Sequence, residues 1–365
     1  MGKIIINEQE FSYQQIKQGK WQEQRPYFQA ALSFCYDWLN GKSSFELQSS
    51  GSTGKPKTIQ VSRVQMSSSA KATGNFFNVQ SDAGLLCCLN TAMIAGKMML
   101  VRAMEWDSRL YLVEPSSNPL LSFPIDQRFD LATMVPLQLE ACLDQAASAT
   151  VLSNIQVVLI GGAPLADAVR QKARKLPTKL FQTYGMTETV SHIALGDLKS
   201  EGPLIYQALP GVLIRQLHEG QLAIKAPMTN DQWISTNDVV EILPSGGFVW
   251  KGRSDFTINS GGVKVQPEEV EGLAAEVIAQ QYPGQRYFVT ALPDAKLGQK
   301  VVLMIEGEQG DEDPQQILEA LKRKLPPYHS PKNLLFVPKF AETASHKISR
   351  HQTLEQWKAL TETGQ

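Results

Sequence analysis

One short loop carries the residue types of a phosphate-binding site. Residues 49–57 read SSGSTGKPK, in which hydroxyl side chains and glycines are followed by two lysines around a proline. The P-loop of nucleotide triphosphatases requires G-x-x-x-x-G-K-[ST] at the start of a helix. Here only two residues separate Gly51 from Gly54, and Pro56 lacks a backbone N–H and disfavours helix in the residue before it. The stretch therefore indicates another kind of phosphate site.

Five further stretches combine glycines with polar or charged residues. They are GGAPL (161–165), QTYGMTET (182–189), WISTNDVVEI (233–242), KGRSDFTINSGGVKVQPEEVE (251–271) and TASHKISR (343–350). With the loop at 49–57, and in this order, they resemble the adenylate-forming superfamily of acyl-CoA synthetases, adenylation domains and luciferases. A surface turn or a solvated side chain explains each stretch alone, but six matches in the superfamily's order are hard to obtain by accident. The resemblance runs from about residue 45 to the end of the chain.

This resemblance implies an α/β fold of mixed α+β character. It predicts a large N-terminal adenylate-forming domain with layered α/β sheets at residues 1–255, shortened at its N-terminus. A small, mobile α+β C-terminal domain with a catalytic lysine follows at residues 256–365. Asp255 matches the hinge about which the small domain rotates in this superfamily.

The chemistry of the superfamily explains why anion-binding residues are needed. A carboxylate is a poor electrophile, so these enzymes attach AMP from ATP and form an acyl-adenylate, whose acyl group CoA then accepts. Because the first step brings an anionic acid against an anionic triphosphate, catalysis depends on positive charge, N–H donors and positioning. The resemblance thus implies ATP, Mg²⁺ and, as co-substrate, CoA.

Most of the implied site residues bind ATP. Backbone N–H groups and hydroxyls of the first loop would surround the β- and γ-phosphates, with a lysine for charge: Ser49, Ser50, Gly51, Ser52, Thr53, Gly54 and Lys57. Residues that match the adenine-lining segment are Gly161, Gly162 and Ala163. The superfamily pattern Y-G-x-T-E is matched by Tyr184, Gly185, Thr187 and Glu188. Tyr184 would stack near adenine, Thr187 would donate to the α-phosphate and Glu188 would hold Mg²⁺.

Three positions in the second half of the chain complete the nucleotide and CoA sites. Asp238 matches the acid that accepts hydrogen bonds from the ribose, and Arg253 matches the arginine at the ribose and phosphate. Gly261 and Gly262 match the segment that approaches CoA. Asn237 replaces a usual glycine and Phe256 a usual second aspartate.

Lys347 matches the lysine that enters the active site during adenylation and leaves it when the small domain rotates. The glycine that usually precedes this lysine is His346 here, while Thr343, Ser345 and Arg350 keep the pattern. We therefore expect Lys347 to be catalytic together with Thr187 and Glu188.

The acid is indicated by the stretch LNTAMIAGKMML (89–100) and its neighbour Arg102. An amino-acid pocket would need a carboxylate there, and none occurs. The short N-terminal region and the spacing from Gly96 to Arg102 resemble the o-succinylbenzoate–CoA ligases of menaquinone biosynthesis. Such a substrate has two carboxylates, and Arg102, with Ser191 and His192, would bind the one that does not react. The alternative for Arg102 is a surface arginine paired with Glu105 or Asp107.

Other functions stay open at this point. A short aryl- or acyl-CoA ligase for another acid, an enzyme that loads a carrier protein, and a non-catalytic nucleotide-binding homologue share most of these motifs. The last would have no need of a mobile lysine, so Lys347 argues against it.

Bulk composition is that of a two-domain globular protein. The chain has 365 residues, 42% of them hydrophobic, and a formal net charge of −1, so no nucleic-acid partner is expected. Four cysteines without a CxxC pair indicate buried thiols in a reducing compartment. No membrane-inserting segment is predicted, because Lys97 and Arg102 interrupt the most apolar stretch. We expect a cytoplasmic monomer or homodimer.

The elements that must position these residues follow from hydrophobic periodicity. Helices are expected at 26–39, 62–77, after Pro136, after the GGAPL turn, at 267–281 and at 314–325. Strands are expected at 45–48, 85–89, 98–101, before Pro136, before Gly161, at KLFQTYG and, in the small domain, around 256–265, 287–292 and 300–305. Hairpin turns are expected at HEGQ (218–221) and PSGG (244–247).

Overall fold

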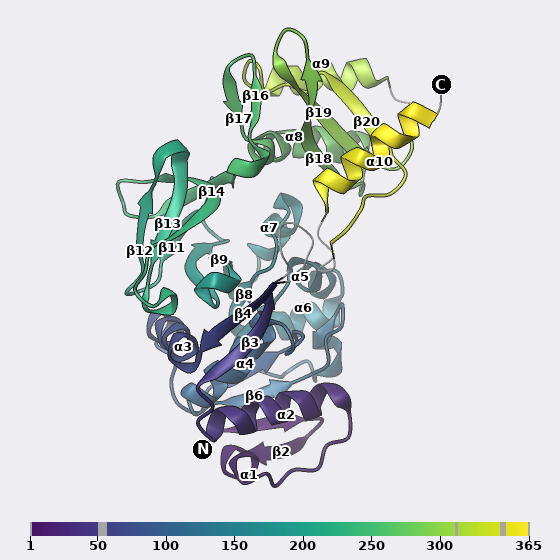
Figure 1. Ribbon diagram of the computed structural model, residues 1–365. Coiled ribbons are helices and arrows are strands. Elements are labelled where there is room, and N and C mark those ends of the chain that lie inside the picture. The colour runs from purple at the N-terminus through teal and green to yellow at the C-terminus, as the bar shows by residue number, and fades with distance from the viewer. Residues whose placement is uncertain (1, 50–56, 311–312, 344–347, 364–365) are drawn as a thin grey trace.

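The protein consists of a large and a small part, which meet near residue 255 (Figure 1). The computed structural model describes residues 2–49, 57–310, 313–343 and 348–363. Over these residues, the large part contains a sheet of 13 strands and a two-stranded sheet, and the small part a sheet of five strands. The mixed α/β fold class is thereby confirmed.

The large sheet has a parallel part and an antiparallel part, and its edge strand β2 pairs antiparallel with β1. Its order is β12-β13-β14-β15-β11-β10-β9-β8-β7-β5-β6-β1-β2. Neighbours from β9 to β1 pair in parallel, and neighbours from β9 to β12 pair antiparallel. The strands are β1 (Lys3–Ile6), β2 (Gln9–Ser12), β5 (Gly84–Cys87), β6 (Arg109–Leu112), β7 (Phe129–Met134), β8 (Ile155–Ile160), β9 (Lys179–Gly185), β10 (His192–Asp197), β11 (Ile205–Ala208), β12 (Leu213–Gln216), β13 (Gln221–Lys225), β14 (Ile234–Ile242) and β15 (Phe248–Arg253). Since ligands of α/β sheets collect beyond the carboxyl ends of parallel strands, the ends of β8 and β9 mark the place to look for a site.

Helices pack on the part of this sheet where the strands are parallel. They are α1 (Tyr13–Lys17), α2 (Pro26–Leu39), α3 (Arg63–Phe77), α4 (Ile94–Glu105), α5 (Pro136–Leu143), α6 (Ala146–Ser153) and α7 (Asp167–Ala173). Short 3₁₀ turns are η1 (Pro119–Ser122), η2 (Thr187–Thr189), η3 (His218–Gly220), η4 (Pro227–Thr229) and η5 (Ser254–Phe256). Both β1 and α2 lie at the end of the large part that is farthest from the C-terminal elements (Figure 1).

Local sequence signals explain where the helices begin and end. Helix α2 starts at Pro26, a residue suited to the first helical turn. Helix α3 starts with a capping box, in which the Ser62 hydroxyl accepts from the Gln65 backbone N–H and the Gln65 side chain accepts from the Ser62 N–H. It ends at Asn78, which adopts the left-handed conformation that asparagine tolerates. The two-stranded sheet before it pairs β3 (Ser44–Ser49) with β4 (Lys57–Ser62).

Most predicted elements are confirmed, but the strand expected at 98–101 is wrong. These four residues lie in α4 and are fully buried. A short apolar run fits a buried helix as well as a buried strand, so periodicity alone does not separate them. Gly96, near the start of α4, packs so closely that a Cβ on it would lie 2.5 Å from the Asn90 carbonyl oxygen.

The small part consists of a sheet with helices packed on it. Its strands are β16 (Ile258–Ser260), β17 (Val263–Val265), β18 (Tyr287–Asp294), β19 (Gly298–Glu306) and β20 (Asn333–Val337), and its helices are α8 (Pro267–Gln281), α9 (Pro314–Lys324) and α10 (Arg350–Thr363). Two hydrophobic clusters stabilise it, and both lie entirely after residue 257. The division into domains at residue 255, and any rotation about it, stay predictions.

The helices of the described ranges are too short or too polar to cross a lipid bilayer.

Candidate active site

The glycine segment predicted to line adenine follows β8 directly. The Gly161 N–H donates to the Met134 carbonyl at the end of β7, 3.0 Å away. Gln182, buried in β9, donates from Nε2 to the Ala163 carbonyl at 3.0 Å and to the Ile160 carbonyl at 3.3 Å. Gly162 has φ of +92°, a conformation suited to glycine. Its backbone therefore turns just beyond the carboxyl end of β8, next to the end of β9.

Tyr184 lies at the end of β9 and contacts the predicted ribose acid. Its hydroxyl donates to Asp238 Oδ2 at 2.7 Å. Its ring packs edge-on against Tyr206 and Phe248. Burial, then the Asp238 charge, raises the pKa of Tyr184, so the hydroxyl stays protonated and acts as a donor. The structure thus adds a polar contact to the stacking role predicted for Tyr184.

A strained turn follows β9 and presents Thr187, Glu188 and Ser191. Val190 is buried and has φ of 66° and ψ of −52°, and the Ser191 N–H donates to the Thr189 carbonyl at 2.7 Å. This is a γ-turn with positive φ, which is rare for a β-branched residue. Glu188 is exposed at the turn, and no described residue pairs with its carboxylate.

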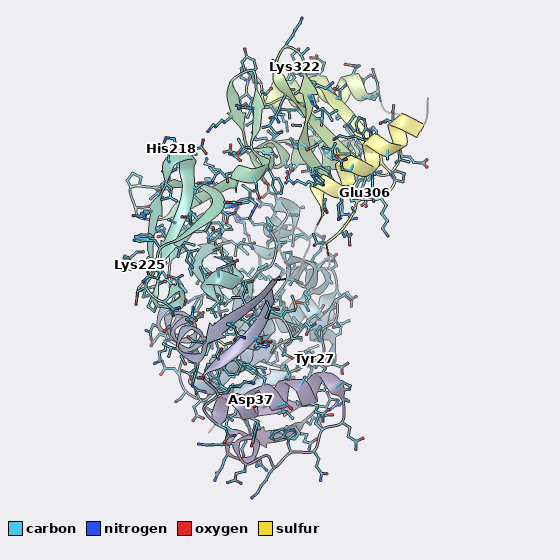
Figure 2. The ribbon with its side chains drawn as sticks, viewed as in Figure 1. Tyr27, Asp37, His218, Lys225, Glu306 and Lys322 are labelled. Atoms are coloured by element: carbon cyan, nitrogen blue, oxygen red, sulfur yellow. The ribbon has the colours of Figure 1, made fainter. Side chains whose placement is uncertain are left out.

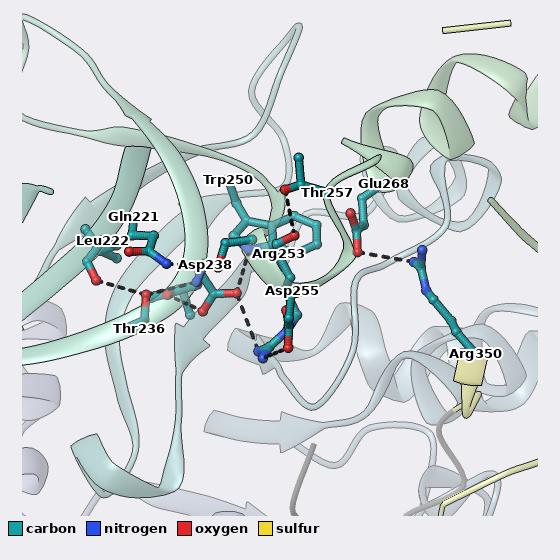
Figure 3. Close-up of polar contacts among 12 residues, drawn as sticks. Gln221, Leu222, Thr236, Asp238, Trp250, Arg253, Asp255, Thr257, Glu268 and Arg350 are labelled. Carbon is teal, nitrogen blue, oxygen red and sulfur yellow. Dashed lines mark hydrogen bonds and ion pairs between the residues drawn. The ribbon is translucent and has the colours of Figure 1, made fainter. Parts of the chain in front are cut away.

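Asp238 and Arg253 are directly paired across β14 and β15 (Figure 3). Arg253 Nη1 lies 4.0 Å from Asp238 Oδ1. Trp250 donates from Nε1 to the same Oδ1 at 3.0 Å. The two residues predicted at the ribose are therefore side by side, and each oxygen of the Asp238 carboxylate accepts one hydrogen bond from an aromatic side chain.

Arg253 is held by the predicted hinge residue. Its Nε and Nη2 donate to the two carboxylate oxygens of Asp255 at 2.9 and 2.8 Å (Figure 3). Burial disfavours the charged form of Asp255. The contact with Arg253, helped by Asn237, outweighs burial, so the pKa of Asp255 is lowered. A phosphate bound by Arg253 would therefore compete with the hinge aspartate for the same guanidinium.

The three residues predicted to bind the substrate acid form one buried cluster. Arg102, on α4, is only 2% exposed and donates from Nη2 to Ser191 Oγ at 2.9 Å. The same nitrogen lies 3.4 Å from His192 Nδ1, at the start of β10. Nη1 contacts Met99 Sδ at 3.6 Å, and no described residue forms a hydrogen bond with the buried Nε. Among the described residues, no carboxylate forms an ion pair with Arg102, so the alternative of a surface arginine paired with Glu105 or Asp107 is wrong.

Hydrogen bonding around His192 fixes which ring nitrogen faces Arg102. Thr73 Oγ1 donates to the Ser69 carbonyl at 3.1 Å and lies 3.1 Å from His192 Nε2. We therefore assign the ring proton to Nε2, which leaves the Nδ1 lone pair for Arg102. Burial, and secondarily the Arg102 charge, holds the pKa of His192 well below its usual range, so the ring is neutral.

Some predicted site residues lie outside the described part of the chain. These are Ser50, Gly51, Ser52, Thr53, Gly54 and the tail lysine, Lys347. Ser49 ends β3 and Lys57 begins β4, so they flank the predicted phosphate loop. Gly261 and Gly262 form the turn between β16 and β17, both with positive φ.

Three residues near the site had no signal in the sequence. Trp250 and Gln182 sit in strands and Thr73 in a helix, where each fits an ordinary structural pattern. Only the neighbouring strands show which polar groups their side chains contact.

The site fits Mg²⁺ bound partly by a substrate. No group of three or more His, Cys, Asp or Glu side chains is placed to hold a metal in the described ranges. Possible ligands are widely separated: His218, in the turn before β13, lies far from Asp37 on α2 (Figure 2). Mg²⁺ commonly uses one or two carboxylates together with substrate phosphates. The unpaired carboxylate of Glu188 suits that arrangement.

Comparisons with known proteins agree with this geometry. A family model described as "AMP-binding enzyme" matches residues 47–224. A 2-succinylbenzoate–CoA ligase of Listeria monocytogenes is 27% identical over 344 residues, covering 87% of this chain and 71% of the relative. An acyl-CoA synthetase (AMP-forming)/AMP-acid ligase II-like protein from Dyadobacter fermentans is 38% identical, with a TM-score of 0.64, covering 93% of this chain and 97% of that structure. An o-succinylbenzoate coenzyme A synthetase from Bacillus subtilis, in complex with ATP and magnesium ion, shares the fold at 21% identity, with a TM-score of 0.71, over 85% of this chain and 69% of the other.

Proposed function

Because the chain belongs to the AMP-binding family of adenylate-forming enzymes, we propose that it is an o-succinylbenzoate–CoA ligase of menaquinone biosynthesis. As an acid–CoA ligase of this family, it uses ATP, Mg²⁺ and CoA. The identity of the acid is the part that is proposed, and it is supported by the substrate cluster and by relatives named 2-succinylbenzoate–CoA ligase.

The single observation that carries the proposal is a buried cation that no anion of the described residues pairs with. Arg102 is 2% exposed, and its Nε has no hydrogen-bond partner among those residues. A buried charge is costly unless it is paired, so such a guanidinium favours a ligand that brings a carboxylate. Ser191 is half-buried and bonds Arg102, so it forms the accessible side of the cluster. A carboxylate binding there would accept from the Ser191 hydroxyl and the guanidinium.

A dicarboxylic acid matches this arrangement better than a monocarboxylic one. One carboxylate has to reach the nucleotide near the turn that bears Thr187 and Glu188. The other would remain at Ser191 and Arg102, which the γ-turn at Val190 connects to the same segment. The neutral His192 adds no competing positive charge and supports the guanidinium from behind.

The nucleotide would lie along the ends of β8, β9 and β14. The segment from Gly161 to Ala163 provides backbone for the adenine, and Asp238 provides acceptors for the ribose. Thr187 and Arg253 would contact the phosphates. The loop between Ser49 and Lys57 would hold the departing pyrophosphate. In this proposal, attack of the substrate carboxylate on the α-phosphorus forms the acyl-adenylate and releases pyrophosphate.

Magnesium ion, held by Glu188 and nucleotide oxygens, would supply positive charge that offsets the repulsion between the acid and the triphosphate. Lys347 would add a second charge during adenylation. For the thioester step we propose that residues 256–365 rotate as a unit about Asp255, bringing Gly261 and Gly262 towards CoA.

Pyrophosphate exchange with a panel of acids tests this function. The purified chain is given ATP, Mg²⁺, labelled pyrophosphate and one acid at a time, and label in ATP is counted. We expect the highest kcat/KM with o-succinylbenzoate and, after CoA is added, its CoA thioester. Faster exchange with a monocarboxylic acid would reject the substrate, and transfer only to a carrier protein would reject CoA as the acceptor.

A further inference from the structure

The carboxylate of Asp238 is held by donors from two other strands, and Figure 3 shows the one from Trp250. Trp250 Nε1 in β15 donates to Oδ1 at 3.0 Å, and the Tyr184 hydroxyl in β9 donates to Oδ2 at 2.7 Å. The backbone N–H of Asp238 donates to Thr236 Oγ1 at 3.1 Å. Since a donor from a different strand binds each oxygen, the plane of the carboxylate is fixed.

A β-bulge brings Trp250 to the side of the sheet where Asp238 lies. Asp238 pairs with Arg253, and a regular ladder would next place Lys251 opposite Val240. Instead the register shifts after Val239, and Val240 pairs with Trp250. Residues 238 and 240 of one strand share a face, and paired residues share it too, so the shift exchanges Lys251 for Trp250 beside the carboxylate. Bulges next to active sites commonly redirect a side chain in this way.

The fixed carboxylate still has unused lone pairs, enough to accept one hydrogen bond from each hydroxyl of a vicinal diol. An ionised carboxylate has about four lone-pair sites and can only accept. Trp250 and Tyr184 occupy one on each oxygen, which leaves one or two on the accessible side. The indole N–H is a donor only, so Trp250 cannot compete with Asp238 for a hydroxyl proton. Arg253 is engaged bidentately by Asp255, and its distance of 4.0 Å to Asp238 Oδ1 makes an ion pair without a hydrogen bond.

We propose that Trp250 is a positioning residue for nucleotide recognition: with the Tyr184 hydroxyl, it orients Asp238 so that the remaining lone pairs accept both ribose hydroxyls. This inference rests on the proposed use of ATP and extends it to a residue that acts through Asp238. It makes Trp250 a determinant of selectivity for ribose over deoxyribose.

The alternative is that Trp250 only packs. Its ring does lie against the core of the large part. A packing role would make its removal lower stability and weaken every nucleotide alike. A positioning role instead weakens ATP most, because ATP offers both hydroxyls to the oriented lone pairs, whereas each deoxy nucleotide offers only one.

The test measures binding of three nucleotides to the full-length protein by calorimetry: ATP, 2′-deoxy-ATP and 3′-deoxy-ATP. In Trp250→Phe, which keeps an aromatic ring and loses the N–H, we expect ATP to bind about tenfold more weakly, while the deoxy nucleotides change less than twofold. Tyr184→Phe should shift the same ratio, and it keeps the proposal testable if the first variant folds poorly. In an Asp238→Asn background, Trp250→Phe should no longer change the ratio, since coupled residues are not additive.

Two matched controls separate positioning from packing. Tyr206→Phe removes a hydroxyl from the ring that packs against Tyr184 but does not bond Asp238. Trp233→Phe removes an indole N–H from an exposed tryptophan whose ring contacts Arg215. Both should leave the ATP to deoxy-ATP ratio unchanged. If Trp250→Phe weakens the binding of all three nucleotides equally, the positioning role is overturned. If the wild-type protein binds none of them, the proposed function is overturned and this role with it.

Discussion

Replacing Arg102 with methionine should stabilise the protein while it destroys substrate selectivity. Burial lowers the pKa of Arg102 to about 10, against an ordinary value of roughly 12.5. Each tenfold change in a protonation equilibrium corresponds to about 1.4 kcal/mol, so keeping this guanidinium charged in the folded protein costs about 3 kcal/mol. This cost is fully present at pH 7, because the pH lies below both pKa values and the side chain is charged in both states.

Arg102→Met removes that cost with a side chain that also fills the space. Ser191 Oγ and His192 Nδ1, which lie 3.4 Å apart, can then satisfy each other. Buried ions replaced by apolar residues of similar volume leave stability unchanged or raise it by about 1–4 kcal/mol. We therefore expect the free energy of unfolding in urea to stay constant or rise by up to about 3 kcal/mol.

The same variant should lose its dicarboxylic substrate. Removing one partner of a buried charge pair costs about 3–5 kcal/mol, which corresponds to a fall of 10²–10³-fold or more in kcat/KM for o-succinylbenzoate. Analogues that lack the second carboxylate should change only a few fold. Pyrophosphate exchange with both kinds of acid gives the ratio directly.

Arg170→Met is the matched control. The Arg170 guanidinium donates to the backbone carbonyls of Leu198, Ser200 and Gly202. Its removal should lower stability and leave the ratio between the two kinds of acid unchanged. If Arg102→Met instead lowers stability and keeps the substrate ratio of the wild type, Arg102 is a structural residue and the reasoning about the buried cation is refuted.

Three further variants probe other parts of the molecule. In Gly185→Ala the new Cβ would lie 2.6 Å from the His192 Cα. We therefore expect unfolding in urea to show a loss of about 1–3 kcal/mol of stability, together with slower pyrophosphate exchange. If both values stay unchanged, the close packing of Gly185 against His192 is contradicted. Burial, only partly offset by Arg350, raises the pKa of Glu271 to about 7, so the contribution of this side chain to stability should fall as pH rises from about 4.3 to about 7. Glu271→Gln should flatten that fall in denaturation curves at several pH values, and an unaltered pH profile would count against it. Lys347→Ala should slow pyrophosphate exchange by roughly 10²–10³-fold and spare thioester formation from a supplied acyl-adenylate; equal loss of both steps would reject its step-specific role.

Much of this architecture could be predicted because its signals are local. Pro26 and Pro267 start helices at the residues expected. The turns at HEGQ and PSGG close the β12–β13 and β14–β15 hairpins, where Leu217 donates to the Gln221 carbonyl and Leu243 to the Gly247 carbonyl. Turn chemistry and periodicity depend on a few neighbouring residues, so a single sequence is enough to find them.

The details of the site depend on contacts that local signals do not encode. Arg102 and Ser191 were expected to share a role, but only the fold shows that one is buried and the other half-buried. Trp250 reaches Asp238 because a bulge shifts the strand register, and no residue type announces that shift. The stretch 98–101 was misassigned because a continuous apolar run has no distinguishing period.

Identification of the products of a single turnover tests the central claim most directly. The enzyme is mixed with ATP, Mg²⁺ and o-succinylbenzoate without CoA, quenched, and analysed by mass spectrometry. We predict pyrophosphate and an adenylate of the acid, up to one per enzyme, which is converted to AMP and the CoA thioester when CoA is added. Formation of ADP and inorganic phosphate, or of AMP at the same rate without any acid, would contradict the account.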